Sequence, residues 1–259
     1  MKPTLFSVKE LTLSYVDLGD RKGYPILTQH GLIASIEDSG LFDSLIRANV
    51  RVICIARPGY GQSTPYLLKS YAEWADLVSP LVKELDLSRF DVLGMSSGAP
   101  FAYALAWKYP RGLRNTYIFS GTPALYDESV LAQWPYPSIK DHCIEALEVL
   151  AKELFFSWVK PDDLKNNDIR DSMMNDCFGV AQDLRLRFMD WGFSLAEIRQ
   201  KVFMHHSRTD DSVPCGTALR TAELLPNCLL ELSETGPHFS PEALDDFIKK
   251  TSIRNLPRE

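Results

Sequence analysis

Short apolar runs alternate with longer segments of helical periodicity along most of this 259-residue chain. Runs typical of buried strands occupy residues 50–56, 90–93, 116–120, 202–206 and 229–232. Helical patterns lie between or after them, at residues 70–85, 99–108, 215–225 and from residue 241 onward. A single helix between two strands favours a parallel crossover. The alternation therefore predicts an α/β fold with a mostly parallel sheet covered by helices on both faces.

Local signals refine this expectation at three places. Two early strand-like runs, residues 11–16 and 26–29, flank a turn-rich stretch, which predicts a hairpin. Ser70 and Glu73 form a capping-box pattern at the start of the 70–85 helix, and Pro80 predicts a kink or break within it. Ser240 is the expected N-cap of the last helix, with Pro241 at its first position.

The segment from residue 121 to residue 198 interrupts the alternation. It contains helical patterns and many aromatic residues but no clear strand. We interpret it as an inserted helical cap, or lid, over one edge of the sheet, with residues 1–120 and 199–259 forming the core domain. Its aromatic residues, among them Trp134, Phe155 and Trp158, are candidates for contacts with a mainly apolar substrate. The alternative is that they pack only against each other within the cap.

Composition excludes several classes of function. Hydrophobic residues make up 45% of the chain, enough for a real core, and the net charge of −6 argues against nucleic-acid binding. We find neither a phosphate-binding loop nor ligand spacing for a metal, and we expect no cofactor. There is no apolar run typical of a leader or a membrane span. Five cysteines without C-x-x-C spacing argue against a disulfide framework and agree with a cytoplasmic protein. The partner we expect is a small-molecule substrate.

The most informative motif is Gly94-Met95-Ser96-Ser97-Gly98, which follows the strand-like run 90–93 and precedes the helical pattern 99–108. A G-x-S-x-G turn in this setting projects the serine hydroxyl outward, and its glycines let the backbone pass closely. The helix that follows offers free N–H groups to a developing oxyanion. We therefore expect Ser96 to be a nucleophile and the backbone N–H of Ser97 to stabilise negative charge.

A serine nucleophile needs a base, and the base needs an acid. His238 lies in a loop after the last strand, whereas His30, His142, His205 and His206 have ordinary structural explanations. The acid is expected in the loop after strand 202–206, where Asp210 and Asp211 compete and Asp210 is preferred. Both loops follow strands of the predicted parallel sheet, so they lie at the same edge as Ser96.

These motifs resemble the α/β-hydrolase superfamily along nearly the whole chain. The resemblance rests on residues 29–32 (QHGL), residues 57–63 (RPGYGQS), the Ser96 turn, the Asp210 loop that ends in Val213-Pro214, and residues 236–238 (GPH). It implies an eight-stranded twisted sheet, a Ser96–Asp210–His238 catalytic triad and an oxyanion hole formed by the N–H groups of Leu32 and Ser97. Arg57 stands where the family usually has Asp, although arginine also occurs there.

The resemblance implies hydrolysis through an acyl-enzyme. A carboxylic ester, thioester or lactone of a small, mainly apolar substrate is the expected target. Three alternatives remain: a peptidase or amidase, a carbon–carbon bond hydrolase of the same fold, and a ligand-binding signalling protein with an intact triad.

Overall fold

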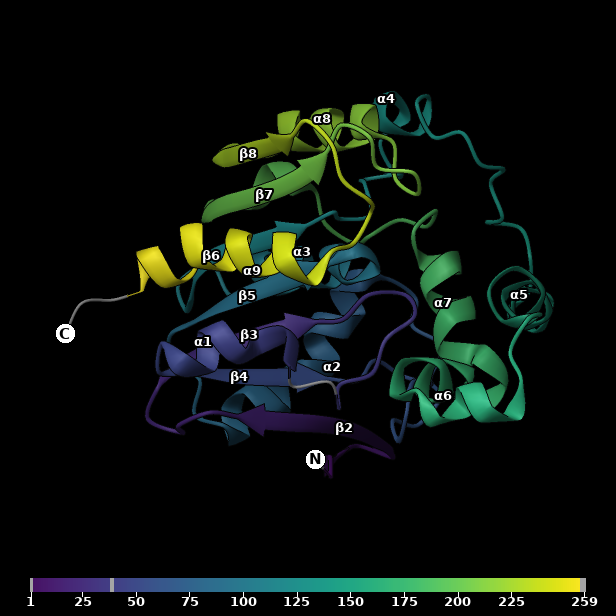
Figure 1. Ribbon diagram of the computed structural model, residues 1–259, viewed down its shortest axis with the longest axis horizontal. Helices are drawn as coiled ribbons and strands as arrows, with labels where there is room; N and C mark the ends of the chain where they lie inside the picture. Colours follow the sequence, from purple (N-terminus) through teal and green to yellow (C-terminus); the bar gives the residue numbers. More distant parts are fainter. Residues whose placement is uncertain (1, 38–39, 257–259) are drawn as a thin grey trace.

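The computed structural model describes residues 2–37 and 40–256, and its centre is a single eight-stranded sheet (Figure 1). The strand order is β1-β2-β4-β3-β5-β6-β7-β8. The strands are β1 Thr4–Val8, β2 Leu11–Leu18, β3 Tyr24–Gln29, β4 Val50–Ile55, β5 Phe90–Met95, β6 Leu113–Phe119, β7 Lys201–Ser207 and β8 Cys228–Ser233. The predicted α/β fold with a mostly parallel sheet is confirmed.

Strand direction determines where functional loops can gather. β3 to β8 are all parallel to one another, whereas β1 pairs with β2, and β2 with β4, in antiparallel fashion. The carboxyl ends of the six parallel strands therefore share one edge of the sheet, where ligands bind in folds of this class.

The predicted hairpin between residues 11–16 and 26–29 is wrong. These residues do form strands β2 and β3, but β4 lies between them and pairs with both. Val52 faces Leu18 on one side and Ile26 on the other. The antiparallel partner of β2 along the chain is instead β1, a short strand that the sequence pattern did not reveal.

Helices cover both faces of the sheet. Figure 1 shows α1 and α9 on the near face, with α2 and α3 behind the sheet. Ser70 caps α2 by accepting a hydrogen bond from the backbone N–H of Glu73, and α2 runs through Pro80 without the expected break. Ser240 caps α9 as predicted. The α-helices are α1 Asp43–Arg47, α2 Tyr71–Glu84, α3 Ala99–Lys108, α4 Glu128–Leu131, α5 Ile144–Ala151, α6 Asn167–Met173, α7 Phe178–Leu186, α8 Cys215–Glu223 and α9 Pro241–Lys250.

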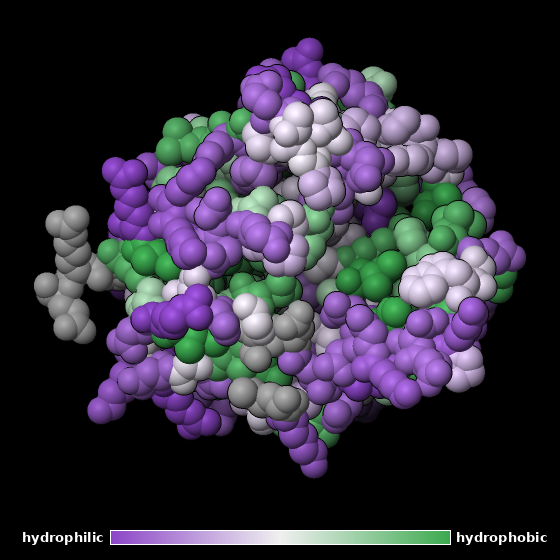
Figure 2. Space-filling view, viewed as in Figure 1, coloured by the Kyte–Doolittle hydropathy of each residue, from purple (hydrophilic) through white to green (hydrophobic). Residues whose placement is uncertain are grey.

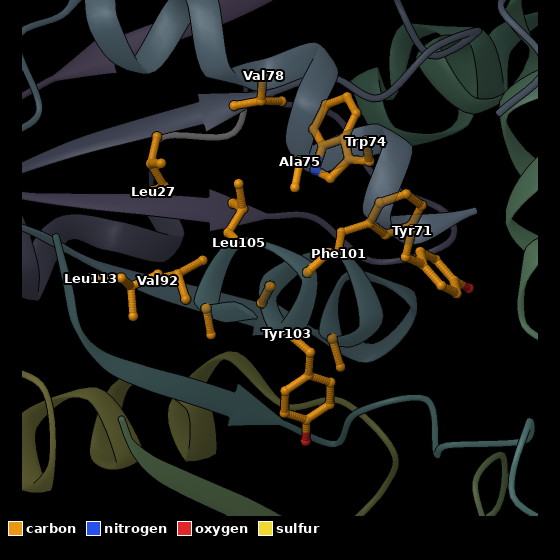
Figure 3. Close-up of a cluster of buried hydrophobic side chains, with 14 of the residues drawn as sticks. Leu27, Tyr71, Trp74, Ala75, Val78, Val92, Phe101, Tyr103, Leu105 and Leu113 are labelled. Atoms are coloured by element: carbon orange, nitrogen blue, oxygen red, sulfur yellow. The ribbon is translucent and has the colours of Figure 1, made fainter. Parts of the chain in front are cut away.

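Aromatic rings fill the core between the sheet and helices α2 and α3 (Figure 3). Tyr71 and Phe101 meet edge to face with ring centroids 4.7 Å apart. Trp74 is fully buried, and its indole N–H donates to the side-chain oxygen of Gln29 at the end of β3. This packing fixes α3, and with it the turn that enters α3, against the sheet.

The segment between β6 and β7 contains α4 to α7 and no strand among its described residues. In Figure 1, α5, α6 and α7 lie on the right, beyond the tips of the parallel strands. They thus stand next to the edge where ligands bind. In the part of the chain that the structure describes, no helix is long and apolar enough to cross a membrane.

Candidate active site

Ser96 occupies the tight turn between β5 and α3. Its φ of 49° lies in the left-handed region, which is uncommon for a residue with a side chain. Glycines on either side make this turn possible. A Cβ on Gly94 would come within 2.8 Å of the Ala102 side chain, and one on Gly98 within 2.1 Å of the carbonyl oxygen of Gln29. The motif is therefore required by close backbone approach as well as by the strained serine.

Three side chains from separate loops meet at this turn. The Nε2 atom of His238 lies 2.8 Å from Ser96 Oγ. On the other side of the ring, His238 Nδ1 lies 2.8 Å from Oδ2 and 3.1 Å from Oδ1 of Asp210. The structure therefore brings Ser96, His238 and Asp210 into one hydrogen-bonded chain, in the order that general-base activation of a serine requires.

Hydrogen bonds hold the Asp210 carboxylate in place, whereas Asp211 does not take part in the hydrogen bonds that link Ser96, His238 and Asp210. The Asp210 carboxylate is fully buried, and Oδ1 accepts hydrogen bonds from the backbone N–H groups of Ser212 and Val213. Burial alone would raise the pKa of Asp210, but the bonds from His238, Val213 and Ser212 outweigh it and lower the pKa below its ordinary value. Asp211 is exposed and hydrogen-bonds the hydroxyl of Ser212.

A second histidine supports the same loop. His206, at the end of β7, donates from Nε2 to the carbonyl oxygen of Val213, and Nε2 also lies 3.3 Å from Asp210 Oδ2. Burial lowers the pKa of His206, so the ring is neutral near pH 7. The sequence indicated only an ordinary structural role for His206; its position against the carboxylate was not evident from the sequence.

The two predicted oxyanion donors, the N–H groups of Leu32 and Ser97, lie on segments next to Ser96. A Cβ on Gly31 would lie 3.9 Å from Ser96 Cβ, so the loop after β3 passes directly beside the serine. In the described part of the chain, the N–H of Leu32 makes no hydrogen bond. Ser97 follows Ser96 in the 3₁₀ turn that leads into α3, where N–H groups lack helical partners. Their joint role as oxyanion donors stays a prediction.

A guanidinium from the segment 121–198 reaches the same turn. Arg187 follows α7 and donates from Nη2 to Ser97 Oγ at 3.3 Å, while its Nε is buried and has no partner among the described residues. Burial lowers the pKa of Arg187, although nearby Tyr71 and Asp183 partly offset this effect. Arginine stays charged in proteins, so a cation with a free donor stands beside the nucleophile turn. Sequence reasoning missed it, because the helical pattern around Asp183 also contains Gln182 and Arg185, so nothing singles out Arg187.

The three aromatic residues proposed as substrate contacts lie in different surroundings. Trp134 meets Tyr136 edge to face, and Phe155 packs near Phe156. Trp158 is 59% exposed. Figure 2 shows hydrophobic side chains gathered on the right of the molecule, the side on which Figure 1 shows α5 and α7. Their assignment as substrate contacts stays a prediction, as does the division into core and cap domains.

No group of three or more His, Cys, Asp or Glu side chains among the described residues is arranged to hold a metal ion. All five cysteines are free thiols. The groups at the site that can perform chemistry are thus a serine hydroxyl, an imidazole, a carboxylate, a guanidinium and backbone N–H groups.

Comparisons with known proteins agree with this fold. Residues 24–138 match the family model described as the alpha/beta hydrolase fold. The uncharacterized hydrolase YcgS of Bacillus subtilis (strain 168) is 27% identical over 148 residues, which are 57% of this chain and 48% of YcgS.

Two further likenesses extend over nearly the whole chain. 2-Hydroxy-6-oxononadienedioate/2-hydroxy-6-oxononatrienedioate hydrolase 2 of Pseudomonas putida is 26% identical over 255 residues, 89% of this chain and 86% of that protein. An esterase from Exiguobacterium antarcticum superimposes with a TM-score of 0.75 at 20% identity, over 98% of this chain and 100% of the esterase. The structural likeness concerns the fold.

Proposed function

We propose that this chain, a member of the α/β-hydrolase superfamily, is a serine hydrolase that cleaves a carboxylic ester, thioester or lactone of a small substrate through an acyl-enzyme. The observation that carries the proposal is the hydrogen-bonded chain from Ser96 Oγ through His238 to Asp210. Free thiols fit a reducing compartment, and we place the enzyme in the cytoplasm.

The proposed reaction has two halves. In the first, Ser96 Oγ attacks the carbonyl carbon while His238 Nε2 takes the hydroxyl proton, and the N–H groups of Leu32 and Ser97 stabilise the oxyanion. His238 then gives this proton to the leaving alcohol, thiol or ring oxygen, and the acyl group stays on Ser96. In the second half, His238 removes a proton from water, whose oxygen attacks the acyl carbon. The bond between this carbon and Ser96 Oγ then breaks, His238 returns the proton to Oγ, and the acid is released. Asp210 orients the ring and stabilises its cationic form.

Hydrolysis of p-nitrophenyl esters of increasing chain length tests this proposal. We expect turnover by the wild-type protein and a fall of about 10³-fold or more in kcat for Ser96→Ala, in keeping with the loss of the nucleophile in enzymes of this kind. Ser79→Ala is a suitable control, because Ser79 lies on α2 and hydrogen-bonds only its own helix backbone and Tyr109. Equal rates for Ser96→Ala and Ser79→Ala would reject the serine-hydrolase proposal.

A second candidate function is hydrolysis of a carbon–carbon bond next to a ketone in a carboxylate-bearing substrate. The specific observation in its favour is Arg187, a partly buried cation beside Ser97 whose Nε donor is buried and has no hydrogen-bond partner among the described residues. Leaving a buried donor without an acceptor is costly unless a ligand supplies one. Three of the curated relatives are named as hydrolases of 2-hydroxy-6-oxo dienedioates or trienedioates, which carry carboxylates. In such a reaction, water would supply a hydroxyl to the acyl carbon and a proton to the departing carbon.

The role of Arg187 is tested with matched substrates. Arg187→Met should raise KM at least tenfold for a p-nitrophenyl ester whose acyl chain ends in a free carboxylate, and should leave KM for the neutral ester of equal length within about twofold. This expectation follows because a bidentate charged hydrogen bond is lost only with the anionic substrate. The control is Arg185→Met, near the end of α7 and two residues before Arg187, since Arg185 donates to the carbonyl oxygen of Leu68. A similar KM change for both esters would show that Arg187 does not bind a substrate carboxylate.

Hydrolysis of a 2-hydroxy-6-oxo dienoic acid decides between the two candidate bonds. Its turnover is measured as the loss of absorbance of the conjugated chromophore. A kcat/KM far above that of every ester would favour carbon–carbon hydrolysis. Ester turnover without loss of the chromophore would favour the first proposal.

A further inference from the structure

We propose that Arg57, Tyr60 and Asp183 are positioning residues for the Leu32 N–H, so that helix α7 controls oxyanion stabilisation from the segment 121–198. Arg57 binds the carbonyl of the peptide group that carries this N–H, Tyr60 binds the carbonyl of the next peptide group in the loop, and Asp183 holds Arg57. The inference rests on the proposed function and adds to it a role for residues that do not touch the reacting atoms.

Three consecutive carbonyl groups beside Ser96 are held in place. Arg57 donates from Nη1 to the carbonyl oxygen of His30 at 2.6 Å and from Nη2 to that of Gly31 at 2.8 Å. The hydroxyl of Tyr60 lies 2.8 Å from the carbonyl oxygen of Leu32. The loop after β3 is thus bound through its carbonyl oxygens to residues that follow β4.

The His30 ring strengthens the same arrangement. The backbone N–H of Arg57 donates to His30 Nε2, and His30 Nδ1 lies 2.9 Å from the carbonyl oxygen of Gly31. A neutral ring with its proton on Nδ1 satisfies both bonds. Burial and the Arg57 charge lower the pKa of His30 well below its ordinary value, which agrees with this neutral form.

Peptide geometry turns these contacts into control of the Leu32 N–H. In a trans peptide group the C=O and the N–H point in opposite directions. The carbonyl of Gly31 and the N–H of Leu32 belong to one such group. Because the Gly31 oxygen is held by Arg57 and His30, the Leu32 N–H points away from them. Rotation of this group would break two hydrogen bonds and turn a carbonyl oxygen toward the developing oxyanion.

The charge of Arg57 is balanced from helix α7. Asp183 accepts from Arg57 Nε at 3.2 Å and from Nη2 at 2.5 Å, and it also lies 3.0 Å from the Tyr60 hydroxyl. Both side chains of the ion pair are essentially inaccessible to solvent. Removing one partner of such a buried pair leaves an uncompensated charge, so the guanidinium depends on Asp183 for its position.

The same helix reaches the second expected donor. Arg187, four residues after Asp183, donates to the side chain of Ser97. The segment around α7 therefore contacts the surroundings of Leu32 through Asp183 and those of Ser97 through Arg187. A helix that is 126 residues from Arg57 in sequence thus connects to both sides of the turn that carries Ser96.

Tyr60→Phe is the primary test, with Tyr117→Phe as a matched control. Both tyrosines are about 1% exposed and lie within hydrogen-bond distance of a buried carboxylate, but Tyr117 bonds Asp91 on β5 rather than the loop at the site. We expect Tyr60→Phe to lower kcat about tenfold with KM within twofold, because a displaced donor weakens only the transition state. Affinity for an alkyl boronic acid, which forms a tetrahedral adduct with the serine, should fall in parallel. Tyr117→Phe should change neither quantity.

Asp183→Asn extends the test to helix α7, with Asp91→Asn as its control for the loss of a buried carboxylate. We expect Asp183→Asn to lower kcat and boronate affinity together, whereas Asp91→Asn affects thermal stability alone. If Asp183→Asn does not fold, the comparison of Tyr60→Phe with Tyr117→Phe decides by itself.

Unchanged kcat in Tyr60→Phe, or equal losses of kcat in Tyr60→Phe and Tyr117→Phe, would overturn the inference. If Tyr60→Phe and Asp183→Asn keep the wild-type kcat while Ser96→Ala is inactive, the inference fails and the proposed function stands. An active Ser96→Ala would reject the proposed function itself.

Discussion

The carboxylate of Asp210 has a hydrogen-bond partner on each oxygen. Oδ1 accepts from two backbone N–H groups of its own loop, and Oδ2 lies 2.8 Å from His238 Nδ1. These donors favour the ionised form, which explains the lowered pKa despite complete burial of the side chain. Asp211, its neighbour, faces solvent. A single position in the chain thus separates a preorganised carboxylate from an ordinary surface one.

Asp210→Asn should therefore lower kcat by about 10³- to 10⁴-fold, the loss typical of a triad whose acid no longer selects the histidine tautomer. Asp211→Asn should stay within about twofold of the wild-type kcat. Steady-state hydrolysis of one p-nitrophenyl ester by both variants measures the difference. An Asp210→Asn enzyme with unchanged kcat would contradict the assignment of the acid.

The strand–turn–helix unit around Ser96 is an element whose geometry follows closely from its sequence. Gly94, Ser96 and Gly98 were recognisable because each has a steric reason to be where it is. The prediction of a hairpin between residues 11–16 and 26–29 was wrong because strand pairing there depends on a distant segment. Local turn residues do not reveal that β4, which follows later in the chain, separates β2 from β3.

Gly98→Ala should destabilise the protein by about 1–3 kcal/mol or prevent folding, because the new methyl group would overlap the carbonyl oxygen of Gln29 and force a backbone shift. Gly31→Ala is the contrasting variant: its Cβ would meet nothing closer than 3.9 Å, and its unfolding free energy should change little. Urea unfolding monitored by circular dichroism gives both values. Equal unfolding free energies of the two variants would show that the turn accommodates a Cβ at position 98 without the expected backbone shift.

Across the whole molecule, three histidines are kept neutral by burial. Burial lowers the pKa of His30, His205 and His206 from the ordinary value of 6.5. The unfolded chain takes up protons at these rings near pH 6.5, whereas the folded protein does so only at lower pH. Their contribution to stability is thus fully present above pH 6.5 and is lost as the pH falls through the folded pKa values.

The free energy of unfolding should therefore be nearly constant from pH 7 to 8 and decline below pH 6.5, by up to about 1.4 kcal/mol per pH unit for each histidine. Urea titrations at half-unit steps between pH 5 and pH 8 measure this slope. A free energy that rises as the pH falls over this range would contradict the burial of neutral rings.

The overall fold was predictable because the alternation of strands and helices extends through most of the chain. Ser96, Asp210 and His238 could be predicted to lie together because each follows a strand of a parallel sheet, and such strands end at one edge. The contacts of Arg57 with Asp183 were beyond sequence reasoning, since a pairing across 126 residues depends on how α7 packs. The same holds for the position of Arg187 beside Ser97.

The central claim is that Ser96 Oγ forms the covalent bond with substrate, and reaction with a fluorophosphonate followed by intact-protein and peptide mass spectrometry tests it most directly. The account predicts one adduct per chain, located on the peptide that contains Ser96, and none in Ser96→Ala. No adduct on the wild-type protein, or an adduct on another residue that persists in Ser96→Ala, would contradict it.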